Sequence, residues 1–367
     1  MKNPYIVRRN KFLDTTVQSF SDLMIKTSSN TGNLFFADAL ERQIDKESLI
    51  RGNLHNIDRV KDKVDSIVIP AANWLKPGNN FLGNYAAAIE KTDLPCVVVG
   101  LGAQSLDMAT PPKLNEGTQR FLKVISERSK QIGVRGELSA ETVRRYGIQN
   151  VTVTGCPSLF WSLKAHIHID HCKNRASELK IATNASRKRK IRAQLNEKKL
   201  SIERQLYLET LYRNDSFFVA QTEMCEIEIA LSGSYAHAND EERLQFEDFV
   251  GVAPEILSAE KFRVFDDIAN WVDALSTVDM TIGTRLHGCI MALMANKPAF
   301  LITIDARTQE LAEFLRLPHC TVQSMPDNLC IEKIYDEYDS SELVSNYPDL
   351  LARYREFLEN NGLTVNF

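Results

Sequence analysis

The sequence contains no apolar run close to the roughly 20 residues that a membrane-spanning helix needs. It also lacks the GxGxxG and GxxxxGK[ST] motifs, so no fingerprint indicates a dinucleotide or a P-loop nucleotide site. Its seven cysteines form no CxxC pair, and no apolar signal segment precedes them. We therefore expect a reduced, cytoplasmic protein without a structural metal, for which peripheral attachment to the inner face of a membrane stays open.

The chain has no excess of positive charge either. Its net charge is −4 and its pI is near 6.0, so no overall field favours nucleic acid or an anionic membrane. Any anionic ligand must therefore be bound by a local group of residues. With 367 residues and 44% hydrophobic content, the chain is long enough for two α/β domains.

Short apolar runs alternate with amphipathic segments along most of the sequence. The runs predict buried strands at residues 23–25, 65–70, 95–100, 131–134, 151–154, 179–184, 215–221, 262–265, 279–282 and 299–304. The amphipathic segments predict helices at residues 34–44, 114–130, 139–146, 267–276, 289–295, 310–315 and 341–360, with Ser139 as an N-cap and Pro348 breaking the last helix. This alternation predicts an α/β protein with two Rossmann-like domains, parallel sheets and a cleft between them.

The domain boundaries follow from the same pattern. We expect an N-terminal domain over residues 1–165, a C-terminal domain over residues 175–340, and a C-terminal helix over residues 341–367 that packs back on the first domain. The linker between the domains carries His166, His168, His171 and Cys172, for which we favour a structural interpretation over a metal site. Residues 187–192 form a basic patch at the head of a long helix, either a solvated face or a grip for phosphate or an anionic headgroup.

Residues 279–314 form the most informative stretch. A strand, a turn with Arg285 and His287, an apolar helix, a second strand and a turn with Asp305 and Arg307 make a βαβ unit. Both turns lie at the carboxyl ends of parallel strands, where open α/β sheets bind ligands. A guanidinium beside a helix amino end suits an anion, and the same dipole favours a neutral imidazole. The alternative is that Arg285 pairs with a carboxylate and His287 caps the helix.

Similar turns occur in the first half. Residues 30–33, with Asn30, Gly32 and Asn33, follow the predicted strand at residues 23–25, as the first ligand loop of a Rossmann-like domain would, although an ordinary capped turn is equally compatible. Asn73 and Gln104 follow the next two strands. Arg135-Gly136 precedes a helix start and is a second turn suited to an anion, whereas Cys156 has no histidine close in sequence and is read as structural.

With these motifs in view, the chain resembles the polysaccharide pyruvyl transferase family. The resemblance rests on the segment GTRLH at residues 283–287, the following IMALMANKPAFLITIDARTQEL, Val134-Arg135-Gly136, the GCPS segment at residues 155–158 and the NTGN turn at residues 30–33. It spans nearly the whole chain, and the RLH element with its downstream Lys-Pro and Asp-x-Arg-Thr-x-Glu is its most specific part. One departure is Asn33, where many relatives carry aspartate.

The resemblance implies a fold similar to GT-B glycosyltransferases and an enzyme that moves a pyruvyl group from phosphoenolpyruvate to a sugar of a surface polysaccharide or its lipid-linked precursor. It implies Arg135, Arg285 and His287 as catalytic residues, with His287 as general acid or base. The expected donor-binding residues are Arg135, Gly136, Gly283, Thr284, Arg285, Asp305 and Arg307. The expected acceptor-binding residues are Asn30, Gly32, Asn33, Asn73 and Gln104. Phosphoenolpyruvate is a substrate here, and no further cofactor and no nucleic acid partner is expected.

Two other functions stay open at the level of sequence. A GT-B glycosyltransferase that uses a nucleotide sugar would share the fold, and so would a catalytically silent sugar-binding protein.

Overall fold

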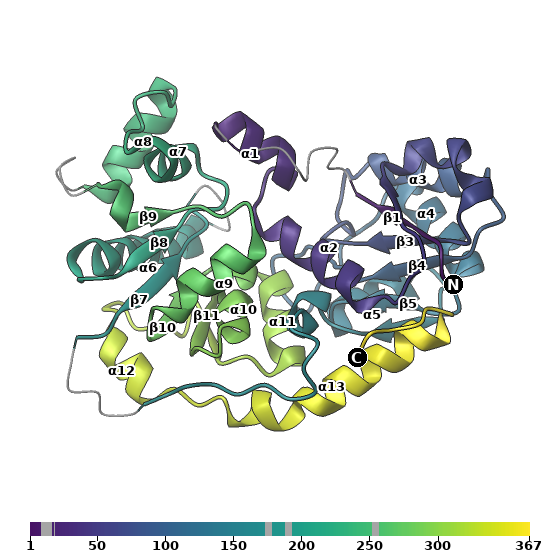
Figure 1. Ribbon diagram of the computed structural model, residues 1–367. Coiled ribbons are helices and arrows are strands. Elements are labelled where there is room, and N and C mark those ends of the chain that lie inside the picture. The colour runs from purple at the N-terminus through teal and green to yellow at the C-terminus, as the bar shows by residue number, and fades with distance from the viewer. Residues whose placement is uncertain (9–16, 18, 173–177, 188–192, 252–256) are drawn as a thin grey trace.

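The computed structural model describes residues 1–8, 17, 19–172, 178–187, 193–251 and 257–367, and it consists of two α/β halves joined side by side (Figure 1). All strand pairs between the named strands are parallel in the described residues. The prediction of an α/β protein with two parallel, Rossmann-like sheets is therefore confirmed. Within the described ranges, no helix combines the length and the apolar character needed to cross a membrane.

The first half contains a sheet in the order β2-β1-β3-β4, to which β5 and β6 are added through a bridge between Leu101 and Val134. Its strands are β1 (Pro4–Val7), β2 (Ile50–Gly52), β3 (Ser66–Pro70), β4 (Cys96–Val99), β5 (Ile132–Val134) and β6 (Val151–Val153). Its helices are α1 (Phe20–Thr27), α2 (Gly32–Gln43), α3 (Phe81–Ile89), α4 (Glu116–Arg128) and α5 (Glu137–Arg144), with 3-10 turns η1 (Leu54–Arg59), η2 (Lys61–Lys63) and η3 (Pro157–Phe160). The strand order changes direction between β1 and β3.

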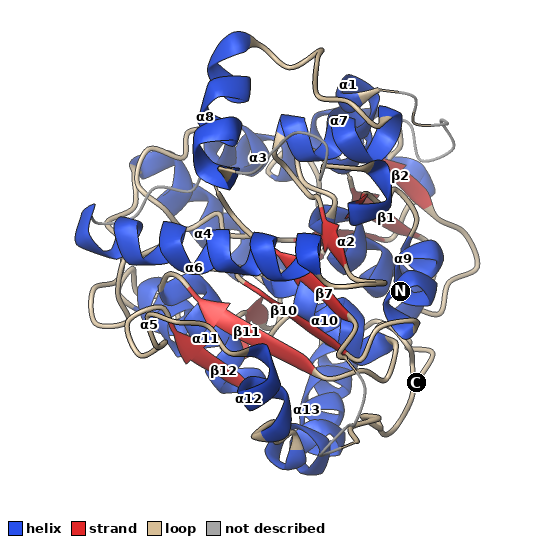
Figure 2. Cartoon of the chain, turned by 90° about the vertical axis from the view of Figure 1, so that its left-hand side faces the viewer, coloured by secondary structure: helices blue, strands red, loops and turns tan. Residues whose placement is uncertain are grey.

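The second half contains a six-stranded sheet in the order β12-β11-β10-β7-β8-β9, which Figure 2 shows in part. Its strands are β7 (Ile181–Asn184), β8 (Phe217–Val219), β9 (Phe262–Arg263), β10 (Met280–Gly283), β11 (Ala299–Thr303) and β12 (His319–Thr321). Its helices are α6 (Ala193–Tyr212), α7 (Met224–Ser232), α8 (Asp240–Val250), α9 (Ile268–Ser276), α10 (Leu286–Met294), α11 (Ala306–Leu315), α12 (Ile331–Asp336) and α13 (Ser341–Asn360). This is the doubly wound strand order of a Rossmann fold, with its reversal between β7 and β10.

The predicted strand at residues 23–25 is wrong, because these residues lie in helix α1. The side chain of Ser19 accepts a hydrogen bond from Asp22 N and caps the helix, and Leu23 packs into an apolar cluster with Tyr207 and Phe218 of the second half. Three apolar residues alone do not distinguish a strand from one buried stripe of a helix. The first strand of the sheet is β1, in a segment whose sequence signal is weak.

Ser139 is not the N-cap of helix α5; Gly136 is, and Ser139 lies in the first turn. Pro348 does not break α13 either, since the helix continues through it to Asn360. A proline inside a helix removes one backbone hydrogen bond and costs about 3 kcal/mol. The buried side chains Tyr347, Leu351 and Tyr354 offset that cost by packing against the core on both sides of the proline.

Helix α13 runs along one side of the molecule from the second half to the first (Figure 1). The Tyr354 hydroxyl donates a hydrogen bond to Gln43 Oε1 of α2 at 2.7 Å, and Phe357 packs against Gly133 of β5. One apolar core contains residues of both halves and of α13, so the halves are held by side-chain packing as well as by the connecting chain.

Candidate functional site

Arg135 follows β5 and is 2% exposed. Its Nε donates to Gly100 O at 2.9 Å and one of its terminal nitrogens donates to Asn73 Oδ1 at 2.6 Å. A Cβ on Gly102 would lie 2.7 Å from Arg135 Cδ, so that position must be glycine for the arginine stem to pass. Burial lowers the pKa of Arg135, and the nearby Arg307 lowers it further. Arg135 is therefore a rigidly held cation whose environment favours an anionic partner.

His287 lies in the first turn of α10, close to Arg135 and Arg307. Burial, followed by the charges of these two arginines, lowers the pKa of His287 to about 3. The imidazole is therefore neutral at physiological pH, as expected from sequence, although burial and not a helix dipole is the main cause. Its Nε2 lies 3.6 Å from Cys156 Sγ, and its ring packs against Phe36 with centroids 5.7 Å apart.

Gly32, at the start of α2, lies against this histidine. A Cβ at Gly32 would lie 2.9 Å from His287 Nδ1, so glycine allows α2 to approach the imidazole. Asn30 Oδ1 accepts a hydrogen bond from Gly32 N at 2.9 Å and fixes the turn. Of the expected acceptor-binding residues, Gly32 thus contacts His287, and Asn30 holds the turn that contains Gly32.

Arg307 reaches the same centre from the first turn of α11. Its Nε lies 3.5 Å from Asp305 Oδ1, and Asp305 also forms a capping box with Thr308. Asp305 and Arg307, both expected to bind the donor, thus form an ion pair with each other. The Arg307 side chain is 18% exposed, so it keeps access to solvent beside the buried Arg135.

Glu310, one turn further along α11, was not expected in the site. Its carboxylate accepts hydrogen bonds from Ser139 N at 3.0 Å and Ser139 Oγ at 2.7 Å, across the boundary between the halves. The Ser139 hydroxyl in turn accepts from Ala103 N at 2.7 Å. Burial raises the pKa of Glu310 to about 7, against the opposing effects of Ser139, Arg135 and Arg307. The start of α5, where the sequence suggested a substrate anion, is thus occupied by a carboxylate of the protein.

Arg285 is placed differently from Arg135 and Arg307. Its guanidinium forms an ion pair with Glu223 at 2.6 Å and hydrogen bonds with Thr222 and the carbonyl of Ala185. Burial raises the pKa of Glu223, but Arg285 and Thr222 outweigh this effect and hold it below its usual value. The alternative that Arg285 pairs with a carboxylate is therefore the arrangement in this structure.

Thr284 and Gly283, which precede Arg285 in sequence, also make contacts within the second half. The Thr284 hydroxyl donates to Glu203 Oε1 at 2.6 Å, and Gly283 packs tightly against Asn184 at the end of β7. Arg187, from the predicted basic patch, is buried and pairs with Glu226 at 2.9 Å, so it is not part of a solvated helix face. Residues 188–192 of that patch lie outside the described residues.

The three remaining acceptor candidates have separate positions. Asn33 Nδ2 donates to the carbonyls of Thr27 and Ser28 at 3.2 and 3.0 Å, which closes the end of α1. Asn73 is engaged by Arg135, and Gln104 is half-buried, with its backbone N–H bonded to Leu75 O at 2.9 Å. Asn33 is the one of these three that lines the pocket described next.

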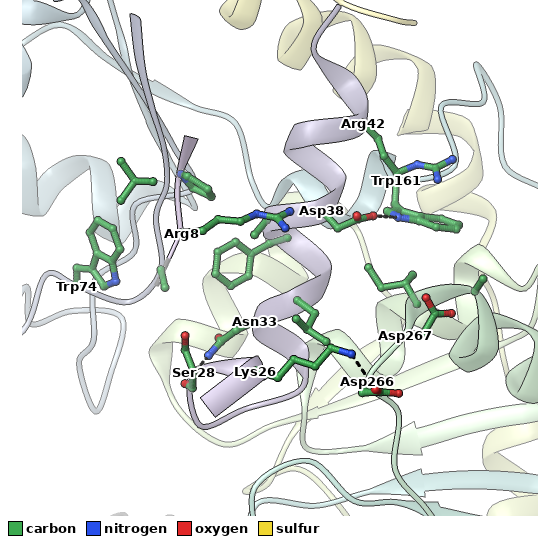
Figure 3. Close-up of a pocket in the computed structure, with 18 of the residues that line it drawn as sticks. Arg8, Lys26, Ser28, Asn33, Asp38, Arg42, Trp74, Trp161, Asp266 and Asp267 are labelled. Carbon is green, nitrogen blue, oxygen red and sulfur yellow. Dashed lines mark hydrogen bonds and ion pairs between the residues drawn. The ribbon is translucent and has the colours of Figure 1, made fainter. Parts of the chain in front are cut away.

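A pocket of about 370 Å³ lies between the two halves (Figure 3). Its walls come from the carboxyl ends of β1 and β3, from helix α2 and from the start of α9. The strand order of the first sheet reverses between β1 and β3, which is where open α/β sheets bind ligands. The lining combines aromatic with charged side chains, namely Phe36, Trp74, Tyr85, Trp161, Arg8, Lys26, Arg42, Asp38, Asp266 and Asp267.

Sequence reasoning missed most of these pocket residues. Arg8 lies in a segment whose sequence signal is weak, and no motif marks Trp161. The position of two of them could have indicated the pocket, because Arg8 and Trp74 each follow a strand of a parallel sheet. Phe36 connects the pocket to the arginine and histidine centre, because it lines the pocket and its ring lies 6.0 Å from the Arg135 guanidinium.

Solved structures with similar architecture include the UDP-GlcNAc 2-epimerase from Neisseria meningitidis bound to UDP-GlcNAc, at 12% identity and a TM-score of 0.43, covering 98% of this chain and 100% of that chain. MnaA of S. aureus, in a structure with UDP, is 12% identical with a TM-score of 0.42, covering 98% and 92%. MurG of Acinetobacter baumannii is 10% identical with a TM-score of 0.38, covering 99% and 95%. No curated protein sequence matches the chain.

The sequence model of one protein family, described as polysaccharide pyruvyl transferase, matches residues 30–306. The match includes the turn at Gly32, Arg135, His287 and most of the pocket between the halves. Because it covers well over half of the sequence, the chain belongs to the polysaccharide pyruvyl transferase family.

Proposed function

We propose that this protein transfers a pyruvyl group from phosphoenolpyruvate to two hydroxyls of a sugar in a polysaccharide or its precursor, forming a cyclic ketal and releasing phosphate. The observation that carries the proposal is the convergence of Arg135 and Arg307, from different halves, on the neutral His287. Family membership supports a transferase.

The donor has two anionic ends, a phosphate and a carboxylate, and a guanidinium binds either in bidentate geometry. Arg135 and Arg307 are the two cations nearest His287 by their effect on its pKa. We assign the two ends of the donor to them. Donor contact through Arg285, which the resemblance implies, requires that its ion pair with Glu223 opens.

Ketal formation needs a balanced transfer of protons. The methylene carbon of the donor gains one proton, the adjacent carbon forms bonds to two sugar oxygens, and its bond to the phosphate oxygen breaks. The two sugar hydroxyls lose two protons, of which one balances the new methyl group and one leaves with phosphate. Because the resting imidazole is neutral, His287 can accept a proton from a sugar hydroxyl but carries no extra proton to donate, which favours it as the base.

Glu310 is the group near this centre that exchanges a proton close to neutral pH, since its pKa is raised to about 7. Its carboxylate is bound to Ser139 and buried, so we assign it a positioning role that ties α11 to α5 beside Arg135. The acceptor approaches from the pocket at Asn33, Trp74 and Trp161, which Phe36 separates from His287.

Incubation with phosphoenolpyruvate and a panel of sugars and lipid-linked oligosaccharides tests the proposal. We expect phosphate release together with a pyruvate ketal on the sugar, detected by mass spectrometry. His287→Ala should abolish both, whereas His168→Ala, at an exposed histidine paired with Asp170, should leave them unchanged. Absence of donor binding and of turnover with every acceptor contradicts the proposal.

The alternative, a transferase that uses a nucleotide sugar, is tested by measuring the melting temperature with different ligands. A Rossmann fold places its nucleotide at the reversal of strand order, here between β7 and β10. The side chains at that place, Arg285 and Arg187, are paired with Glu223 and Glu226. We therefore expect UDP and GDP to leave the melting temperature unchanged under conditions in which phosphoenolpyruvate raises it; the reverse result favours the glycosyltransferase.

A further inference from the structure

We infer that the pocket between the halves recognises an acidic group on the acceptor sugar, a phosphate or a carboxylate, and that Arg8 is the residue that binds it. The identification of this ligand as the acceptor rests on the proposed function. The acidic character of the ligand rests on the pocket alone.

Arg8 is buried to about nine-tenths, yet its Nε and one terminal nitrogen make no hydrogen bond within the described residues. It follows β1, is 9% exposed and points into the pocket (Figure 3). Its Nε is buried and has no hydrogen-bond acceptor in the described part of the chain. A buried guanidinium nitrogen without an acceptor costs free energy, which an anion in the pocket would recover.

Two carboxylates act on the charge of Arg8, those of Glu41 and Asp38, and that of Glu41 is shared. A terminal nitrogen of Arg8 lies 3.1 Å from Glu41 Oε2 without the geometry of a hydrogen bond. Arg51 binds the same carboxylate with both its Nε, at 3.0 Å, and a terminal nitrogen. The Glu41 carboxylate is therefore shared between Arg8 and Arg51.

The three acidic residues of the pocket lining are already engaged. Asp38 accepts from Trp161 Nε1 at 2.7 Å, and Asp266 pairs with Lys26 at 2.8 Å. Asp267 caps helix α9 by accepting from Asn270 N at 2.9 Å. Each of these carboxylates therefore has a hydrogen-bond partner other than Arg8, and the charge of Asp266 is balanced by Lys26.

Arg42 adds a second cation at the mouth of the pocket. Its guanidinium lies 4.4 Å from the centroid of the Trp161 ring and is exposed. Among the described residues, Arg42 takes part in no ion pair. Arg42 thus places a second positive charge on the wall of the pocket that helix α2 forms.

The remaining lining suits the sugar itself. Trp74 and Tyr85 belong to an aromatic cluster with edge-to-face contacts at 5.9 Å, and Trp161 forms the opposite side beside Arg42. Aromatic faces bind the apolar faces of sugar rings, while the polar groups between them bind hydroxyls. The pocket therefore combines surfaces for a sugar ring with one for its acidic substituent, next to Phe36 and the proposed donor centre.

The test uses three glucose derivatives, of which one carries a phosphate, one a carboxylate and one no charge: glucose 1-phosphate, glucuronic acid and methyl glucoside. Each is titrated into the full chain by calorimetry. We expect the two acidic sugars to bind about 10- to 100-fold more tightly than methyl glucoside, the size of one charge-assisted hydrogen bond. Preference for the phosphate alone, or the carboxylate alone, supports the inference and identifies the group. Equal affinities for all three overturn it.

Variants of Arg8 and Arg51 show which residue causes the preference for acidic sugars. Arg8→Gln should remove the preference for acidic sugars and leave the binding of methyl glucoside unchanged. Arg8→Lys should retain part of the preference. Arg51→Gln is the matched control, because Arg51 contacts the same Glu41 from outside the pocket. If Arg8→Gln weakens neutral and acidic sugars equally, Arg8 is only a packing residue and the inference fails. Phosphoenolpyruvate is titrated separately: its failure to bind counts against the proposed function, and the sugar titrations still decide on Arg8.

Discussion

Replacing Glu310 with glutamine tests whether this carboxyl is buried as the structure has it. Burial raises its pKa to about 7, from the usual value near 4.5. The folded state therefore binds this proton more tightly than the unfolded state does. The stability of the wild-type protein should fall, relative to Glu310→Gln, as pH rises from about 4.5 to about 7.

The size of this effect follows from the shift. A difference of about 2.5 pKa units corresponds to about 3 kcal/mol. With an entropy of unfolding of about 2 cal/mol/K per residue, 367 residues convert this into roughly 4 °C of melting temperature. Between pH 5 and pH 8, the melting temperature of Glu310→Gln should thus rise by most of this amount relative to the wild type.

Thermal unfolding of both proteins at pH 5, 6, 7 and 8, followed by circular dichroism, measures the difference. Glu313→Gln is the control, since Glu313 is an exposed residue of the same helix whose carboxylate contacts Gln309. A constant difference between wild type and Glu310→Gln across this pH range would refute the reasoning. The carboxyl of Glu310 would then not be buried in the folded protein.

Two further results are expected. Glu223→Gln should lower the melting temperature by roughly 4 to 6 °C, because breaking a buried ion pair costs about 3–5 kcal/mol. A change below about 1 °C would show that Arg285 is not buried against Glu223. The ring of His287 should stay neutral in NMR titrations from pH 8 to pH 5. Arg135→Gln should raise the pKa of His287, because it removes one of the charges that lower it. Titration of His287 in the wild type near the ordinary pKa of about 6.5 would contradict this reasoning.

Most of the sheet could be predicted because the strands are buried on both faces and read as continuous apolar runs. The strands β10 and β11 lie within one residue of their predicted bounds, whereas helix α10 begins three residues earlier than predicted, at Leu286. The error at residues 23–25 arose because the helix that contains them buries only one stripe, supplied by Leu23. The strand β1 was missed because it is short and lies ahead of any recognisable turn.

The site was predicted less completely, for a different reason. Arg285 and Glu223 are 62 positions apart, and Ser139 and Glu310 are 171 apart, so both pairs depend on how the chain folds. A sequence shows that an arginine follows a strand, but not which of several acidic residues neutralises it. Arg135 and His287 were identifiable because both follow predicted strands at a glycine turn.

The meeting of the first and last segments has a consequence for synthesis on the ribosome. Val365 pairs with Ile44 in an antiparallel bridge, Asp45 N bonds to Thr364 O at 2.8 Å, and Leu358 and Leu363 lie in the same core as Ile6 and Phe35. The first half therefore emerges with one apolar face uncovered until residues 341–367 have been synthesised. Until then this face of the nascent chain is open to chaperones and to aggregation.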